Sequence, residues 1–169
     1  MNSMRTLFLG CDPGKKGALA FLDPVSMDLT CIDMPLSKTP TGKDEIDIRA
    51  LAEILRIPLG YNRNIAVIEK VASRPTDGHV GAFGFGLGYG ALRMGIIGHG
   101  YEDRYVTPPV WKKHFRLSKD KGVSRAYAQT RFPSYAHLFA RIKDDGRAEA
   151  ALIALYGAEV LAPSPATNP

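Results

Sequence analysis

Hydrophobic residues are grouped along this chain in short continuous runs that end at glycine, proline or charged residues. Such runs, rich in Val, Ile, Leu and Phe, are typical of strands buried on both faces of a sheet. Pro13 and Gly14 place a turn between the first two runs, which predicts a hairpin. We expect five strands, at residues 5–12, 18–22, 29–34, 65–69 and 104–106.

Other segments have the spacing of helices. Apolar residues recur every three or four positions between residues 46 and 57, and Pro58 ends that pattern. Pro108 and Pro109 suit the first turn of a short helix that carries Trp111. Two more helices are expected, over 118–131 with Ser118 or Asp120 as the N-cap, and over 145–160.

The segment from residue 78 to residue 100 is unusually rich in glycine. Glycine is unfavourable inside helices, yet the segment lacks the alternation of a strand, so part of it is predicted to be a helix whose glycines allow close approach of another element. A glycine-rich phosphate cradle is the alternative. The motifs that would support it, GxxxxGK[ST] or a helix-opening GxGxxG, do not occur.

The order of these elements indicates one α/β domain. Three successive strands predict a β-meander, and the alternating helices and strands that follow predict a five-stranded mixed sheet flanked by helices on both faces. We expect the domain to cover residues 1–160, with residues 35–43 as a loop. The proline-rich residues 161–169 are expected to be a disordered tail.

Four acidic residues have the placement that a metal-dependent nuclease needs. Asp12 and Glu69 each end an apolar strand, and Asp145 and Glu149 share one face of the last helix because they lie about one turn apart. Clustered carboxylates suit Mg²⁺, which prefers oxygen ligands and retains water. Considered alone, Asp12 fits a turn residue and Asp145 a helix N-cap, whereas Glu69 has no obvious structural purpose.

Charge is concentrated in one part of the chain. The net charge is +5, but ten basic and only three acidic residues lie between Thr107 and Arg147. A basic segment beside an acidic cluster fits a polyanion held over a metal site, although a solvated helical face would look the same. The candidate nucleic-acid-binding residues are Arg74, Lys112, Lys113, Lys119, Lys121 and Arg125.

Several classes of protein fit the sequence poorly. Cys11 and Cys31 have no metal-ligand spacing and indicate reduced thiols, so we expect a cytoplasmic protein. Because glycines and charges interrupt each apolar run, we expect no membrane span and no membrane partner. Four scattered histidines are not predicted to be ligands, and Trp111 is expected in the core.

Four motifs together resemble a known family. Cys11-Asp12-Pro13-Gly14 and its hairpin resemble the first-strand motif of RuvC-type Holliday-junction resolvases, which belong to the ribonuclease H-like superfamily. Ile68-Glu69 resembles the second acid of that family. The stretches 106–112 and 145–150 resemble its lysine-bearing helix and its closing helix with two acids. The resemblance extends over roughly residues 5–157.

This resemblance implies a site and a reaction. Asp12, Glu69, Asp145 and Glu149 would hold two Mg²⁺ ions, and Mn²⁺ is expected to substitute. One ion would lower the pKa of a bound water for attack on phosphorus, and the other would neutralise charge on the leaving oxygen. Lys112, which fits the family position better than Lys121, would stabilise transition-state charge.

The resemblance also implies a substrate and an assembly. The enzyme would be a homodimer that resolves four-way DNA junctions by paired symmetric nicks in recombination and repair, without a small-molecule cofactor. The expected interface lies between Gly78 and Gly98, although that segment could instead pack only within the monomer. Its candidate apolar contacts are Phe83, Phe85, Leu87, Leu92 and Ile96.

The sequence departs from the family pattern at two places. The last acid is Glu149, four residues after Asp145, where many members have Asp at a spacing of three, and Asp144 is an adjacent candidate ligand. Many relatives carry an aromatic wedge shortly after the second acid. Here residues 71–74 contain none, which leaves Phe83 or Phe85 as candidates. The variant looks more like phage or prophage members, which implies the cytoplasm of a bacterial or phage-infected cell.

Three other functions remain open. A ribonuclease H-like enzyme acting on RNA or RNA–DNA hybrids would keep the metal site and change the substrate. An actin-like ATP-binding domain also begins with a strand and Asp-x-Gly, but such proteins need a second domain and about twice the length. A catalytically silent nucleic-acid-binding module would not need four acids.

Overall fold

The computed structural model describes residues 5–56, 60–72 and 78–161. Its centre is a five-stranded sheet in the order β3-β2-β1-β6-β7. Strands β1, β2 and β3 form an antiparallel meander, and β6 and β7 run parallel to β1. The predicted mixed sheet is therefore confirmed. The strands are β1 (Thr6–Asp12), β2 (Ala18–Leu22), β3 (Leu29–Asp33), β6 (Arg63–Glu69) and β7 (Glu102–Val106).

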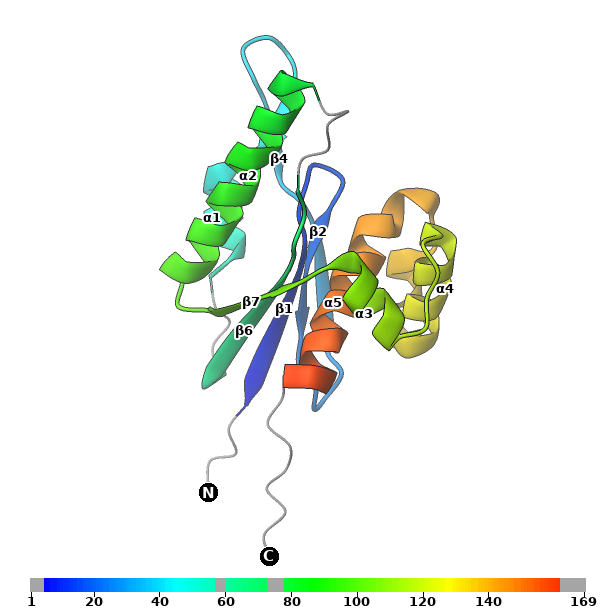
Figure 1. Cartoon of the computed structure of the whole chain (residues 1–169). Helices are drawn as coiled ribbons and strands as arrows, with labels where there is room; N and C mark the ends of the chain where they lie inside the picture. The colour runs from blue at the N-terminus through cyan, green and yellow to red at the C-terminus, as the bar shows by residue number, and fades with distance from the viewer. Residues whose placement is uncertain (1–4, 57–59, 73–77, 162–169) are drawn as a thin grey trace, which may run out of the picture.

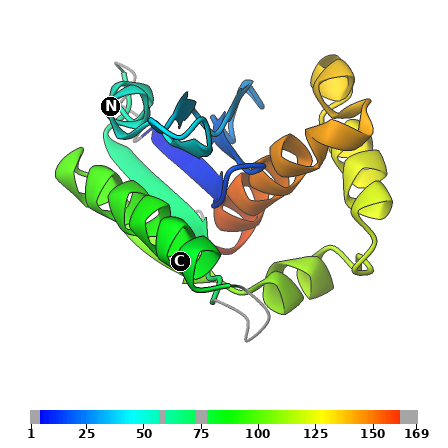
Figure 2. The ribbon, with the colours of Figure 1, turned by 90° about the horizontal axis from the view of Figure 1, so that it is seen from above.

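Helices cover both faces of the sheet, as Figures 1 and 2 show. Helices α1 (Ile48–Ile54) and α2 (His79–Gly98) lie on one face. Helix α5 (Asp145–Leu161) lies on the other, and α4 (Lys121–Arg131) packs outside it. The short helix α3 (Pro108–His114) links β7 to this second layer. The arrangement is the expected three-layer α/β fold.

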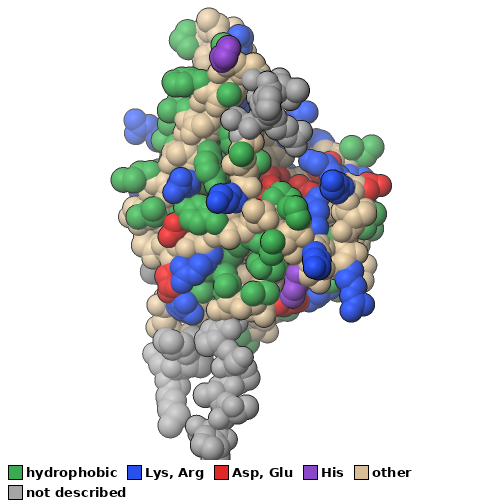
Figure 3. All heavy atoms as spheres, in the orientation of Figure 1, with side chains coloured by type: hydrophobic (Ala, Val, Ile, Leu, Met, Phe, Trp, Pro, Cys, Tyr) green, Lys and Arg blue, Asp and Glu red, His purple; other side chains and the backbone are tan. Residues whose placement is uncertain are grey.

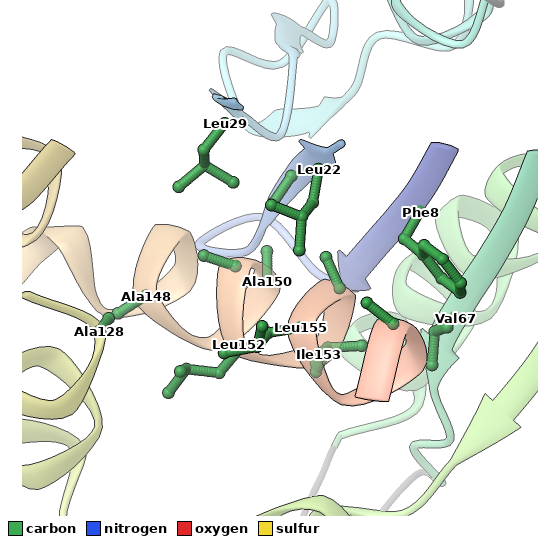
Figure 4. Close-up of a cluster of buried hydrophobic side chains, with 14 of the residues drawn as sticks. Phe8, Leu22, Leu29, Val67, Ala128, Ala148, Ala150, Leu152, Ile153 and Leu155 are labelled. Atoms are coloured by element: carbon green, nitrogen blue, oxygen red, sulfur yellow. The ribbon is translucent and has the colours of Figure 1, made fainter. Parts of the chain in front are cut away.

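Helix α5 is the central element of the core, because 11 of its 17 residues are buried. Its side chains pack against Phe8, Leu22, Leu29 and Val67 of the sheet (Figure 4). The contact with β1 is unusually close. A Cβ atom at Gly10 would collide with the backbone of α5 at Ala150 and Ala154. Glycine at this position therefore fixes how near α5 approaches the sheet.

The opposite face of the sheet has its own core. Leu9 and Ile68 of the central strands pack against Leu51 of α1 and against Leu92 and Ile96 of α2. Alternate residues of β1 and β6 thus supply two separate cores, as expected for strands covered on both faces.

The predicted loop at residues 35–43 is wrong in part. Strands β4 (Leu36–Lys38) and β5 (Asp44–Ile46) pair there as a two-stranded antiparallel sheet. Each strand has three residues, which is too short for an alternating pattern to be recognised. Helix α1 also begins later than expected, because the side chain of Asp47 accepts a hydrogen bond from the Ala50 backbone and caps it.

The polypeptide between α4 and α5 differs from expectation as well. It forms two 3-10 helices, η1 (Pro133–Phe139) and η2 (Ile142–Asp144), which no sequence pattern predicted. Asp120 is the N-cap of α4, as one of the two alternatives proposed. Helix α5 extends to Leu161, and the proposed tail otherwise lies outside the described residues.

Helix α2 overturns the expectation that no segment approaches a membrane span. By length and composition alone it could cross a bilayer, and it is the one such helix among the described residues. Glycine interrupts its apolar run without adding charge, and Arg93 is its one Lys, Arg, Asp or Glu residue. A single helix of this kind is weak evidence of membrane association.

Candidate active site

Asp12 and Glu69 lie side by side at one edge of the sheet. They end the neighbouring parallel strands β1 and β6, directly after the paired residues Cys11 and Ile68. Because side chains alternate along a strand, both acids lie on the face that carries Phe8 and is covered by α5. The carboxyl edge of parallel strands is where α/β proteins commonly bind ligands.

Glu149 joins these two acids from α5. It lies one residue before Ala150, whose backbone rests directly against Gly10 of β1. This close helix–sheet contact brings the second turn of α5 beside the end of β1. The Glu149 side chain is almost fully buried, at 8% exposure, so its position is set by packing rather than by solvent.

The electrostatics of the three acids show that their charges interact. Burial raises the pKa of Asp12 well above its ordinary value, and the charges of Glu149 and Glu69 raise it further. Burial also raises the pKa of Glu69, against the effect of a hydrogen bond from Trp111. Acids in this relation exist together as carboxylates only when cations stabilise them.

Two lysines supply positive charge at this point. The Nζ atom of Lys112, on α3, lies 2.8 Å from Oε1 of Glu149. The Nζ atom of Lys121, at the start of α4, lies 4.0 Å from Oε2 of the same residue. The structure thus brings the predicted Lys112 into contact with a predicted acid, and it places Lys121 nearby.

Trp111 is buried, as predicted, but it also contacts the candidate site. Its indole Nε1 donates a hydrogen bond of 2.8 Å to Oε1 of Glu69. The sequence interpretation treated Trp111 only as a core residue. A buried tryptophan generally needs an acceptor for its N–H group, and that requirement was the signal for this contact.

Asp145 has an ion-pair partner of its own. Its carboxylate forms an ion pair with Arg125 of α4. Asp144, the adjacent candidate ligand, is 2% exposed, and both of its oxygens accept hydrogen bonds from Arg141. Asp144 therefore stabilises η2 through its capping box and is not available as a ligand.

The acids do not form a ready metal cage. Within the described parts of the chain, no group of three or more His, Cys, Asp or Glu side chains is arranged to hold a metal ion. The ion pairs of Glu149 and Asp145 give a physical reason, because Lys112 and Arg125 hold these carboxylates. The donor set itself, carboxylate oxygens at one edge, has the chemistry that Mg²⁺ prefers.

The predicted nucleic-acid-binding residues fall into three groups. Lys113 and Lys119 line a cleft of about 540 Å³ between α3 and the following loop. Lys112 lines the same cleft, and it contacts the acids as Lys121 and Arg125 do. Arg74 lies outside the described residues. In Figure 3 acidic atoms lie near the middle of the visible face, with Lys and Arg side chains to their right.

Comparisons with solved structures identify the fold. RuvC from Thermus thermophilus in complex with a Holliday junction substrate matches 91% of this chain over 95% of its own, with a TM-score of 0.60 and 14% identity. Another structure of Thermus thermophilus RuvC matches over 90% of this chain and 95% of its own chain, with a TM-score of 0.52 and 13% identity. The fowlpox virus Holliday junction resolvase matches over 92% of this chain and 99% of its own chain, with a TM-score of 0.49 and 16% identity.

No family model matches the sequence, and no curated protein matches it. The likeness to the two RuvC structures extends over nearly the whole chain, which confirms the predicted ribonuclease H-like fold.

Proposed function

We propose that this protein is a metal-dependent endonuclease that cuts branched DNA, as RuvC-type resolvases do. One observation carries the proposal: Asp12, Glu69 and Glu149 converge at the carboxyl edge of β1 and β6, and Lys112 contacts Glu149. On the RuvC fold, this combination supports phosphodiester hydrolysis better than simple binding, because a binding surface for DNA has no need of buried acids.

Asp12, Glu69 and Glu149 are the residues proposed to hold Mg²⁺, with Asp145 as a fourth ligand at the margin. Their oxygen-only chemistry and their mutual repulsion fit a hard divalent cation. Bound there, such ions would supply a water of lowered pKa and would neutralise charge on the leaving oxygen.

The remaining residues would prepare this site. Trp111 donates a hydrogen bond to one oxygen of Glu69 and so orients the carboxylate. Lys112 holds Glu149 in the resting protein, and it is close enough to the acids to contact a phosphate that reaches them. A lysine is a compact point charge, so it can stabilise charge that develops on a phosphate oxygen.

A four-way junction is the proposed substrate. The basic segment between Thr107 and Arg147 supplies contacts for phosphates, and the structure of RuvC that this fold matches holds a Holliday junction. The alternative, cleavage of RNA or RNA–DNA hybrids at the same site, is an outcome that the test below separates.

Four-way junctions, linear duplexes and RNA–DNA hybrids should be incubated with Mg²⁺, with Mn²⁺ and with EDTA. We expect paired nicks in junctions only, and none in EDTA. Asp12→Asn, Glu69→Gln and Glu149→Gln should each reduce cleavage by on the order of 10³-fold while junction binding persists. Combining them should add little, because residues of one site act as a unit.

Arg56→Gln, on the far side of the sheet, is a charge-changing control that should cut normally. Near wild-type cleavage by Glu69→Gln would remove the proposed site. Cleavage of hybrids in preference to junctions would replace the proposed substrate.

A homodimer through α2 is the proposed assembly. Val80, Phe83, Leu87 and Met94 are 77%, 74%, 55% and 70% exposed. Positions 80, 87 and 94 repeat every seven residues, which aligns them on one face of the helix. This stripe corrects the interface expected from sequence, because Leu92 and Ile96 are buried within the monomer and Phe85 stacks on Tyr89.

We also propose that the protein acts in the cytoplasm. Cys11 and Cys31 are free thiols in the structure, and burial raises the pKa of Cys31 to about 12. Thiols of such high pKa are poor nucleophiles and remain reduced in a reducing compartment.

A further inference from the structure

A second basic cleft shares no lining residue with the cleft between α3 and the loop that follows it. It has a volume of about 490 Å³ and is lined by the β1–β2 turn, the end of β3 and η2. Lys16 and Lys143 are exposed along it, and among the described residues neither contacts a carboxylate. Its two acids are already paired, Asp33 with Arg147 and Asp145 with Arg125. The cleft therefore presents net positive charge.

Each of the two basic clefts has one lysine that lies beside Glu149. Lys112 lines the first cleft and contacts Oε1 of Glu149, whereas Lys121 lines the second and lies beside Oε2. A polyanion that occupied both clefts would therefore run past Glu149. A single DNA strand crossing the site would place phosphates of one side in each cleft.

The wall of the second cleft is built rigidly. Asp144 accepts hydrogen bonds from both the backbone and the guanidinium of Arg141, which fixes the single turn of η2. That turn presents Ile142 with 79% of its surface exposed, next to Lys143. A large apolar side chain held outward on an anchored turn, between cations, is suited to contact a sugar or base face.

We propose that this second cleft binds the DNA strand on one side of the cut, and that the cleft between α3 and the following loop binds it on the other side. Lys16 and Lys143 contact its phosphates, and Ile142 packs against the adjoining nucleotide. Backbone contacts of this kind position a strand without reading its sequence. The inference rests on the proposed function, and it defines which protein surface each side of the cut strand occupies.

The test uses junctions that carry one neutral methylphosphonate at successive positions around the cut phosphate. Binding is measured in EDTA, so cleavage does not enter. Wild-type protein should lose affinity for substitutions on both sides of the cut. The double variant Lys16→Gln with Lys143→Gln should keep its affinity when methylphosphonates lie on one side of the cut only. The double variant Lys113→Gln with Lys119→Gln should keep its affinity when they lie on the other side only. Each lysine removed should lower the slope of log Kd against log salt by about 1.

Arg56→Gln is the matched control, because it removes one charge far from both clefts and should keep the wild-type pattern. Ile142→Ser should weaken binding without changing the salt slope, since no charge is lost. The proposal is overturned if Lys16→Gln with Lys143→Gln retains sensitivity on both sides. If the wild-type protein cuts no DNA with Mg²⁺ but this one-sided pattern appears, the proposed nuclease activity fails while the strand path stands.

Discussion

Glu149 is held by packing on one side and by charge on the other. Its side chain is nearly buried beside two further acids, and Lys112 and Lys121 place positive charge next to it. Removing one partner of a buried ion pair is costly because the other charge stays behind without compensation. The same lysines that stabilise the acids are therefore placed to exchange Glu149 for a substrate phosphate when cations take over the acids.

Trp111→Phe tests the hydrogen bond that the buried indole donates to Glu69. The change removes the hydrogen bond to Glu69 inside the core, so we expect the free energy of unfolding to fall by about 1–3 kcal/mol. Cleavage should fall as well, because Glu69 loses the contact that orients it. Urea unfolding and junction cleavage measure the two effects.

Tyr101→Phe is the comparison for that variant. The Tyr101 hydroxyl is buried and has no hydrogen-bond partner among the described residues. Its removal should leave stability unchanged or raise it, since an unpaired buried hydroxyl is unfavourable. Equal losses of unfolding free energy in both variants would show that the Trp111–Glu69 hydrogen bond does not itself stabilise the fold.

At the level of elements, the contact between β1 and α5 positions the site. Gly10→Ala would bring a Cβ atom against the Ala150 backbone, which cannot move independently of the helix. We expect a loss of about 1–3 kcal/mol in unfolding free energy. Cleavage should fall further than stability explains, because α5 carries Glu149 away from Asp12. Cleavage by the folded variant well below its melting temperature checks this.

Gly86→Ala provides a control with the same chemical change. Gly86 is exposed within α2, and nothing lies within 4 Å of the added methyl group. Alanine is a better helix former there, so stability should rise by about 0.5–1 kcal/mol with cleavage unchanged. A stable, fully active Gly10→Ala protein would contradict the role given to the close contact.

The elements also show what local sequence can predict. Asp12 and Glu69 could be placed together because both end buried strands, and strand ends of a parallel pair share an edge. Helical spacing correctly put Asp145 and Glu149 on one face, but it could not predict which basic residue pairs with each of them. Arg125 and Lys112 come from other helices, so the pairing depends on tertiary packing. The hairpin of β4 and β5 and the cleft at Lys143 depend on long-range contacts in the same way.

At the level of the whole molecule, the two faces of α2 have different roles. One face buries Leu92 and Ile96 against the sheet, whereas the other exposes a stripe that includes Phe83 and Leu87. Figure 3 shows hydrophobic side chains gathered over this helix on the left of the view. Exposed apolar patches of this kind mark association surfaces. Because a four-way junction is two-fold symmetric, a two-fold dimer would match it.

Phe83→Asp combined with Leu87→Asp should therefore abolish dimerisation without unfolding the monomer, since both side chains lie outside the core. Light scattering at micromolar concentration should give wild-type protein twice the 18.4 kDa chain mass and the variant the single mass. The variant should nick junctions on one strand at a time, because paired nicks require two linked sites. Val25→Asp, at a position 87% exposed elsewhere on the surface, is the control and should stay dimeric. If the variant Phe83→Asp with Leu87→Asp remained dimeric, the interface would lie elsewhere than on α2. A monomeric wild-type protein that binds lipid vesicles through this helix would instead assign the stripe to a membrane surface.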